Sequence, residues 1–180
     1  MRPAIATSPA TDTLVEMASR GQRPAFEQLV ETRLDRTFRT ACAILGNEAD
    51  ARDATQEAFI AAWIKLPRLR DSAKFDAWLN RVVLNVCRDA LRKRGRAREI
   101  DLAATDIGGP DSQGEIADRE VFNAAFDRLN FADRSILVLH HLHHLSMSEI
   151  AAQLGVPTGT AKSRMYTARR ALERALEAEG

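Results

Sequence analysis

Between residues 158 and 172 the chain repeats charged, hydroxyl and aromatic side chains at helical spacing, with small and apolar residues between them. Guanidinium and ammonium groups bind phosphates or donate to guanine, hydroxyls bond to phosphates and base edges, and an aromatic ring can contact a thymine methyl group. This chemistry suits the recognition of a DNA groove. The side chains that we expect to contact DNA here are Thr160, Lys162, Ser163, Arg164, Tyr166, Thr167, Arg169 and Arg170.

Two helices joined by a short turn must position these side chains. Gly155 permits the backbone reversal that ends a first helix with an apolar face. Pro157 then favours the start of a second helix near Thr158, where the hydroxyls of Thr158 and Thr160 are expected to cap free N–H groups. The pattern predicts a helix-turn-helix, although a plain helical hairpin with a solvated basic face has the same spacing.

A second basic stripe lies in the first half of the chain. It consists of Arg81, Asn85, Arg88 and Arg92, which recur at offsets of four, seven and eleven residues. These offsets place the four side chains on one face of a helix, and cationic groups with an amide suit a phosphate backbone. The loop before this helix, residues 68–74, is polar and basic as well.

The helix predicted over residues 48–66 has a polar face opposite its apolar one. The polar face consists of Asp50, Asp53, Gln56 and Glu57. Such a face is free to meet a partner. It is also what an ordinary solvent-facing helix shows.

Helical periodicity dominates the chain and divides it into two domains. The periodicity fails over residues 95–114, which are low in large apolar side chains and rich in helix breakers. We therefore expect an all-α protein with two small helical domains. The predicted parts are an N-terminal extension (1–22), a first domain (23–94), a flexible linker (95–114), and a second domain (115–180) that ends in the helix-turn-helix.

The net charge is nearly balanced, with 26 Lys and Arg against 25 Asp and Glu, so affinity for nucleic acid must come from segregated charge. No apolar run approaches a membrane span, and the N-terminus lacks the apolar core of a signal peptide. We therefore expect a cytoplasmic protein without membrane insertion. Motifs of phosphate-binding loops, metalloproteases and Ser-His-acid hydrolases are absent, so we expect no enzymatic activity and no cofactor.

All the histidines of the chain lie close together, at His140, His141, His143 and His144. Adjacent histidines on a helix point in different directions, and no cysteine completes a metal site, so a solvated or partner-facing helix end is favoured over metal sensing. Cys42 and Cys87 lie in apolar helical stretches without metal-type spacing. They are interpreted as buried free thiols rather than as a redox switch.

Three strings, in this order, resemble bacterial sigma-70 factors of the extracytoplasmic-function group. They are DARDATQEAFIAAW (50–63), WLNRVVLNVCRDALRKR (78–94) and GTAKSR (159–164). By this resemblance, residues 26–94 look like the promoter-melting domain of those factors. Residues 115–176 look like their domain that recognises the upstream promoter element.

The resemblance implies roles for particular residues. The face of Asp53, Gln56 and Glu57 corresponds to the surface that docks on the clamp helices of the largest polymerase subunit. The basic loop and the following helix correspond to the segment that opens the downstream element, where separated bases favour aromatic pockets and cationic side chains. The residues assigned to this second role are Arg68, Arg70, Lys74, Trp78, Arg81, Asn85, Arg88 and Arg92.

The partners implied are core RNA polymerase, promoter DNA and an anti-sigma factor. The main alternative is a helix-turn-helix regulator that binds duplex DNA without polymerase, and the polar face at 50–57 and the basic loop argue against it. A more distant alternative is a sigma-like decoy that binds an anti-sigma protein. The intact basic faces argue against the decoy.

The third string departs from the family in one informative way. Similar proteins often read Gly-Thr-Val-Lys-Ser-Arg, followed by an aromatic residue or His and then a basic residue. Here Ala161 replaces the valine and Thr167 stands at the later basic position. Because threonine cannot make the bidentate guanine contact of an arginine, we expect the upstream element to differ from the common one.

Overall fold

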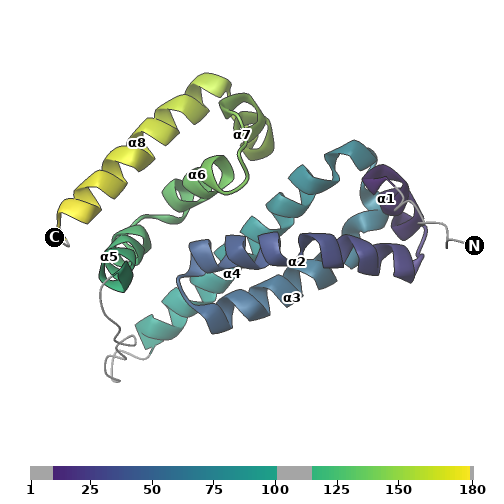
Figure 1. The fold of residues 1–180 in the computed structure, drawn as a ribbon, viewed down its shortest axis with the longest axis horizontal. Helices are drawn as coiled ribbons and strands as arrows, with labels where there is room; N and C mark the ends of the chain where they lie inside the picture. Colours follow the sequence, from purple (N-terminus) through teal and green to yellow (C-terminus); the bar gives the residue numbers. More distant parts are fainter. Residues whose placement is uncertain (1–9, 101–114, 179–180) are drawn as a thin grey trace, which may run out of the picture.

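The computed structural model describes the chain at residues 10–100 and 115–178, with side chains at 10–95 and 121–178. Regular structure in these ranges is helical, which confirms the expected all-α fold. The helices form two groups, α1 to α4 and α5 to α8 (Figure 1). No helix within these ranges has the length and apolar character needed to cross a membrane.

The first group contains four helices and a connection of two short 3-10 turns. They are α1 (Thr11–Ser19), α2 (Arg23–Leu45), α3 (Glu48–Lys65), η1 (Leu66–Arg68), η2 (Ser72–Lys74) and α4 (Phe75–Ile100). Gly46 ends α2 in the left-handed conformation, with φ of 66°, and the Asn47 side chain accepts from the Asp50 N–H to start α3. The buried face of α3 is rich in alanine, which lets α2 and α4 approach closely.

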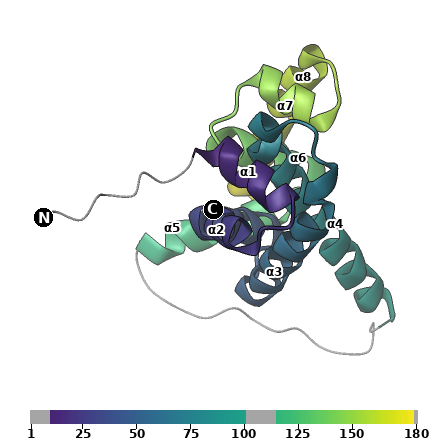
Figure 2. The same ribbon diagram turned by 90° about the vertical axis from the view of Figure 1, so that its right-hand side faces the viewer.

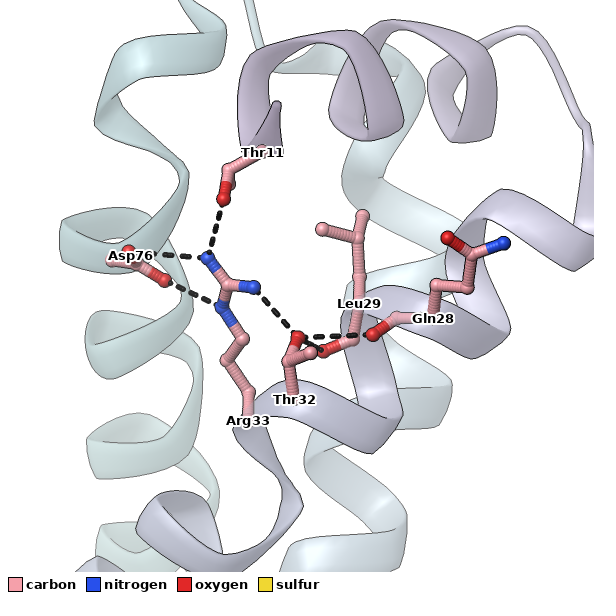
Figure 3. A network of polar contacts seen from close by, with 6 residues as sticks. All are labelled: Thr11, Gln28, Leu29, Thr32, Arg33 and Asp76. Carbon is pink, nitrogen blue, oxygen red and sulfur yellow. Dashed lines mark hydrogen bonds and ion pairs between the residues drawn. The ribbon is translucent and has the colours of Figure 1, made fainter. Parts of the chain in front are cut away.

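Arg33 of α2 joins three helices at one end of this group (Figure 3). Its Nε donates to the Asp76 carboxylate of α4 at 3.1 Å, and its Nη2 donates to Thr11 Oγ1 of α1 at 3.1 Å. The apolar side of α1, including Leu14 and Val15, is buried. Residues 11–19, which the sequence placed in an N-terminal extension, thus form a helix packed on the first domain. Nine residues are too few to show a clear apolar period.

The helix α4 is longer than expected. It continues to Ile100, six residues beyond the domain boundary predicted at 94, so the first part of the predicted linker is helical. Gly95 lies inside this helix, where a glycine costs about 1 kcal/mol relative to alanine, and the surrounding Arg and Ala residues favour the helix. Residues 101–114 of the predicted linker lie outside the described residues.

The second group also contains four helices. They are α5 (Glu115–Asp127), α6 (Phe131–His141), α7 (Met147–Leu154) and α8 (Thr158–Glu177). A capping box between Ser146 and Glu149, which we did not predict, starts α7. Gly155 ends the helix at φ of 67°, and this end was predicted from the sequence. The expected capping of α8 by Thr158 and Thr160 is wrong: its cap residue is Pro157, without a side-chain bond. Both threonines already lie inside the helix, whereas a capping hydroxyl must precede it.

The two groups pack on each other through α2 and α6 and through α4 and α7. Figure 1 shows α6 lying between α8 and the helices of the first group, and Figure 2 shows α7 and α8 together on one side of that group. At one edge of this contact, Asp127 of α5 occupies the space that a side chain at Gly46 would need. Gly46 therefore has two roles. Its left-handed conformation ends α2, and its lack of a side chain lets Asp127 of the second domain approach closely.

Candidate nucleic-acid interface

The helix α8 separates a buried face from a solvent face. Ala161, Met165 and Ala168 are buried against α6 and α7. Tyr166 is 68 % exposed, so its ring is available to a ligand rather than to the core. Thr160 is half-buried, and the other predicted DNA-contacting side chains of α8 are exposed: Lys162, Ser163, Arg164, Tyr166, Thr167, Arg169 and Arg170.

Two hydroxyls on this face are already hydrogen bonded to the helix itself. Ser163 Oγ donates to the Thr160 carbonyl at 3.0 Å, and Thr167 Oγ1 donates to the Ser163 carbonyl at 3.1 Å. In these rotamers each hydroxyl offers only lone pairs outward, so it accepts hydrogen bonds from a ligand and donates none. Arg170 lies 3.7 Å from Glu173 in an exposed pair of little energetic weight.

The stripe predicted on α4 forms one exposed face, as its spacing indicates. Arg88 Nη2 donates to Asn85 Oδ1 at 2.7 Å, and the Arg88 guanidinium lies 5.9 Å from the centre of the Phe131 ring of α6. Arg92 pairs with Asp89 at 3.6 Å. The middle of this stripe therefore faces the second domain, which the sequence did not indicate.

The connection before α4 holds its basic side chains in different ways. Arg68 and Arg70 are exposed, whereas Lys74 Nζ lies 3.0 Å from the carboxylate of Asp71. Asp71 also accepts from the Ala73 N–H and so starts η2, a structural role that sequence reasoning missed. Trp78 is half-buried, with its ring centre 5.9 Å from that of Phe75, and this packing leaves one part of the indole accessible.

The structure separates Asp50 from the other three residues of the predicted polar face. Asp53, Gln56 and Glu57 are exposed on α3. Asp50 is half-buried, and Arg94 Nη1 donates to its carboxylate at 3.3 Å. Asp50 therefore ties the start of α3 to α4, while the other three side chains remain open to a partner.

An apolar groove of about 1190 Å³ between α2 and α3 runs beside this polar face, and sequence reasoning missed it. Leu34 and Ile60, which line the groove, are 49 % and 53 % exposed, and Ile64, one turn further along α3, is 67 % exposed. The sequence could have indicated this apolar surface through Ile60 and Ile64. These two large apolar residues lie four positions apart on α3 and off its alanine-rich buried face. Gln56 lines the groove, so polar and apolar surface meet there.

The two basic faces meet in a second cavity of about 490 Å³ between the domains. The first domain lines it with Arg81, Asn85 and Arg88 of α4. The second domain lines it with Gln153 of α7 and Arg164 of α8. The sequence treated these faces as separate surfaces, whereas in this arrangement they lie against each other.

His143 is buried in the contact between the domains and is not at a solvated helix end. Its Nε2 lies 2.8 Å from Thr40 Oγ1, and its carbonyl accepts from Arg36 Nη2 at 3.1 Å. The Thr40 hydroxyl donates its proton to the Arg36 carbonyl. The hydrogen bond between Thr40 Oγ1 and His143 must therefore use a proton on Nε2 of His143. Nδ1 is therefore an unprotonated, buried acceptor, and it has no hydrogen-bond partner among the described residues.

The remaining metal and thiol hypotheses are less favoured by the geometry. No group of three or more His, Cys, Asp and Glu side chains in the described ranges is arranged to hold a metal ion. Cys87 is fully buried, and burial raises the pKa of its thiol to about 12, so it stays neutral. Cys42 is half-buried and its pKa is raised as well, mainly by burial.

Lowering the pH from 7 to 5 should reduce the free energy of unfolding by about 2 kcal/mol, because His143 takes up a proton when the chain unfolds. Burial, and then the charge of Arg36, lower the pKa of His143 to about 4 from its ordinary 6.5. Between these values the unfolded chain binds a proton that the packed chain does not, so stability is full above pH 6.5 and declines as the pH falls towards 4. Urea unfolding at both pH values measures the difference.

The matched variants for this measurement are His143→Gln and His144→Asn. Glutamine can still donate to Thr40 but does not titrate, so His143→Gln should flatten the pH dependence. His144 is exposed and has a φ of 54°, which asparagine tolerates, so His144→Asn should keep the wild-type dependence. An unchanged pH slope in His143→Gln would exclude His143 as the titrating group.

Comparisons with known proteins match both domains in order. Residues 29–97 match Sigma-70 region 2, and residues 119–172 match Sigma-70 region 4. ECF RNA polymerase sigma factor SigE of Mycolicibacterium smegmatis is 33% identical over an alignment that covers 83% of this chain and 60% of that protein. RNA polymerase sigma factor NccH of Alcaligenes xylosoxydans xylosoxydans is 32% identical over an alignment that covers 95% of this chain and 97% of that protein.

Several solved structures share the arrangement of the helices. One of them is the sigma factor RpoE of Bartonella quintana, in complex with the anti-sigma factor NepR. The TM-score is 0.70 at 25% sequence identity, and the match covers 84% of this chain and 96% of that one.

Proposed function

The chain belongs to the extracytoplasmic-function group of the sigma-70 family, and we propose which of its surfaces carries out each step of transcription initiation. As a sigma factor, it binds core RNA polymerase and directs it to promoter DNA. The observation that supports this assignment is that α3, α4 and α8 each present a face of exposed polar or charged side chains.

We assign polymerase binding to the exposed face of α3. Asp53, Gln56 and Glu57 point to solvent, and the groove between α2 and α3 adds apolar surface beside them. A patch with an apolar centre and a charged rim is the usual composition of a protein interface. We predicted Asp50 for the same surface, but it is a weaker candidate for polymerase binding because its carboxylate is already paired with Arg94.

We assign the downstream promoter element to α4 and the basic connection before it. Arg81, Asn85, Arg88 and Arg92 form a cationic face that suits a phosphate backbone. The accessible part of Trp78 offers a surface on which a separated base can stack. Arg68 and Arg70, exposed at the start of this segment, extend the positive surface.

We assign the upstream element to α8. Its exposed face fits the second helix of a helix-turn-helix, which lies in the major groove. Lys162, Tyr166 and Thr167 are placed to contact base edges, and Arg164 and Arg169 to contact phosphates.

An anti-sigma protein is the third partner that we propose, because the structurally similar RpoE is bound to one. In this proposal the chain itself catalyses no reaction, since nucleotide polymerisation belongs to the core enzyme. Because its proposed partners are polymerase and promoter DNA, we also propose that the protein is cytoplasmic.

Run-off transcription with purified core polymerase on a library of genomic promoters tests the function. We expect discrete transcripts that depend on the added protein. DNA binding without polymerase and without transcripts would instead favour a helix-turn-helix regulator that acts alone.

Thr167→Arg is expected to change which base pairs are preferred in the upstream element. A long bidentate donor at this exposed position can reach guanine, so the preference at one or two adjacent base pairs should shift by about 1–3 kcal/mol. A binding-site selection with the protein bound to core polymerase measures the shift.

Arg169→Ala is the matched variant on the same helix. Loss of a phosphate contact should weaken binding to all sequences alike and reduce the salt dependence. The assignment of the reading face is reversed if Thr167→Arg leaves every position unchanged while Arg169→Ala alters base preference.

A further inference from the structure

The cavity between the domains has the size of a ligand site. It lies where the middle of α4 faces the turn of the helix-turn-helix, and its volume of about 490 Å³ falls in the usual range of small-molecule pockets, about 300–1,000 Å³. A duplex is too wide to enter such a space. The cavity therefore suits a small molecule rather than promoter DNA.

The lining of the cavity is cationic. It includes the guanidinium groups of Arg81, Arg88 and Arg164, and no acidic side chain is among the lining residues. Arg81 and Arg164 form no ion pair with any described residue, and Arg88 is held in place by Asn85 and by the ring of Phe131. Three like charges around a partly enclosed space repel one another, and an anion between them removes this repulsion.

Gln153 provides an independent observation that points to a ligand. Its side chain is only 6 % exposed, and neither its amide nitrogen nor its amide oxygen has a hydrogen-bond partner among the described residues. Buried polar groups in folded proteins are nearly always paired, and an unpaired one is destabilising. Both amide atoms are covered in this rotamer, so a rotation of the Gln153 side chain towards the cavity that it lines would let a bound molecule supply the missing partners.

We propose that the cavity binds a small phosphate-bearing molecule, with Arg81, Arg88 and Arg164 around its phosphate oxygens and Gln153 Nε2 donating to one of them. Guanidinium groups match the geometry of phosphate oxygens and bind them in pairs. Inorganic phosphate and a nucleotide share this chemistry.

A bound phosphate also has a consequence that rests on the proposed function. It would hold the basic faces of α4 and α8 against each other, and these are the faces assigned to promoter DNA. The ligand should therefore strengthen the packing of the two domains and reduce promoter binding.

Isothermal titration calorimetry of the full chain at constant ionic strength tests the binding, with inorganic phosphate, pyrophosphate and ATP as separate probes. We expect saturable binding with a dissociation constant below about 1 mM for at least one probe, together with a rise in melting temperature. Tighter binding of ATP than of phosphate would identify a nucleotide as the source. Absence of saturable binding of all three probes up to about 10 mM would overturn the proposal.

Two variants of Gln153 test whether the binding occurs in this cavity. Gln153→Leu removes a hydrogen bond to a charged group and should weaken binding about tenfold or more. Gln153→Glu keeps the size of the side chain but adds a negative charge, so it should abolish binding. Gln28→Leu, at an exposed glutamine of α2, is the matched control and should bind as the wild type does. Circular dichroism checks that each variant is folded.

Promoter binding by the holoenzyme separates this proposal from the proposed function. Gln153 belongs to neither the DNA surfaces nor the polymerase surface, so in buffer without phosphate or nucleotide the holoenzyme with Gln153→Leu should bind promoter DNA as the wild type does. Added ligand should inhibit the wild type and have much less effect on Gln153→Leu. Equal phosphate affinity of the wild type and Gln153→Leu would show non-specific binding to basic faces and overturn the site. A holoenzyme that binds no promoter DNA in this ligand-free buffer would overturn the function instead, and the calorimetric result would still stand.

Discussion

Replacing both Asp53 and Glu57 with lysine is expected to lower the affinity for core RNA polymerase about 100-fold, which is close to 3 kcal/mol. Both carboxylates are exposed on α3 and form no ion pair with a described residue, so the change leaves internal contacts intact. A charge of the wrong sign at a partner surface slows association and costs several kcal/mol when it meets a like charge. A fluorescence binding titration with labelled core enzyme measures the effect.

The matched control reverses two charges elsewhere on the same domain. Asp12→Lys with Glu16→Lys, at exposed positions of α1, changes the net charge equally and should leave the affinity close to wild type. Circular dichroism should show the same helicity in both double variants. Wild-type affinity after the change on α3 would remove that face from the polymerase-binding surface.

Arg81→Ala together with Arg88→Ala is expected to reduce open-complex formation on a duplex promoter at least tenfold, and to have a smaller effect on a promoter with a pre-melted bubble. The two guanidinium groups lie on the exposed stripe of α4 and can hold the phosphates of a separated strand. A pre-melted template no longer requires the protein to stabilise strand opening. Permanganate footprinting on both templates measures the difference.

Arg20→Ala together with Arg39→Ala is the control for loss of two positive charges. Both side chains are exposed, and the contact of Arg39 with Asp35 is long, at 3.8 Å, so its removal should cost little. This variant should open both templates like the wild type. Equal defects of the α4 variant on duplex and bubble would indicate a general loss of DNA binding or of the fold.

The local structure of the candidate site could be predicted from the sequence because it depends on short-range patterns. The spacing of small and apolar residues on α8 predicted which face is buried, and Ala161 and Met165 are indeed buried. Gly155 adopts the left-handed conformation that the turn requires. The offsets on α4 placed Arg81 and Arg88 on one exposed face. Each of these features is set by residues a few positions apart.

Features that depend on contacts between distant residues could not be predicted. The burial of His143 requires Thr40, more than a hundred residues earlier in the chain, and no local pattern indicates that pair. Asp50 was grouped with the exposed face of α3 by its spacing, but Arg94 draws it towards α4. The cavity at Gln153 exists only because two domains meet. The role of the exposed residues in binding stays a prediction for the experiments above.

If the two domains must separate before they bind promoter DNA, the fit of Asp127 against Gly46 makes promoter affinity depend on the fraction of open molecules, those whose domains are apart. If only open molecules bind DNA, the apparent dissociation constant is the intrinsic one divided by the open fraction, so ~1% open molecules gives ~100-fold weaker binding. A side chain at Gly46 would both strain its left-handed backbone and displace Asp127, which raises the open fraction. Residues that never touch a nucleotide can thus set how tightly the protein binds its promoter.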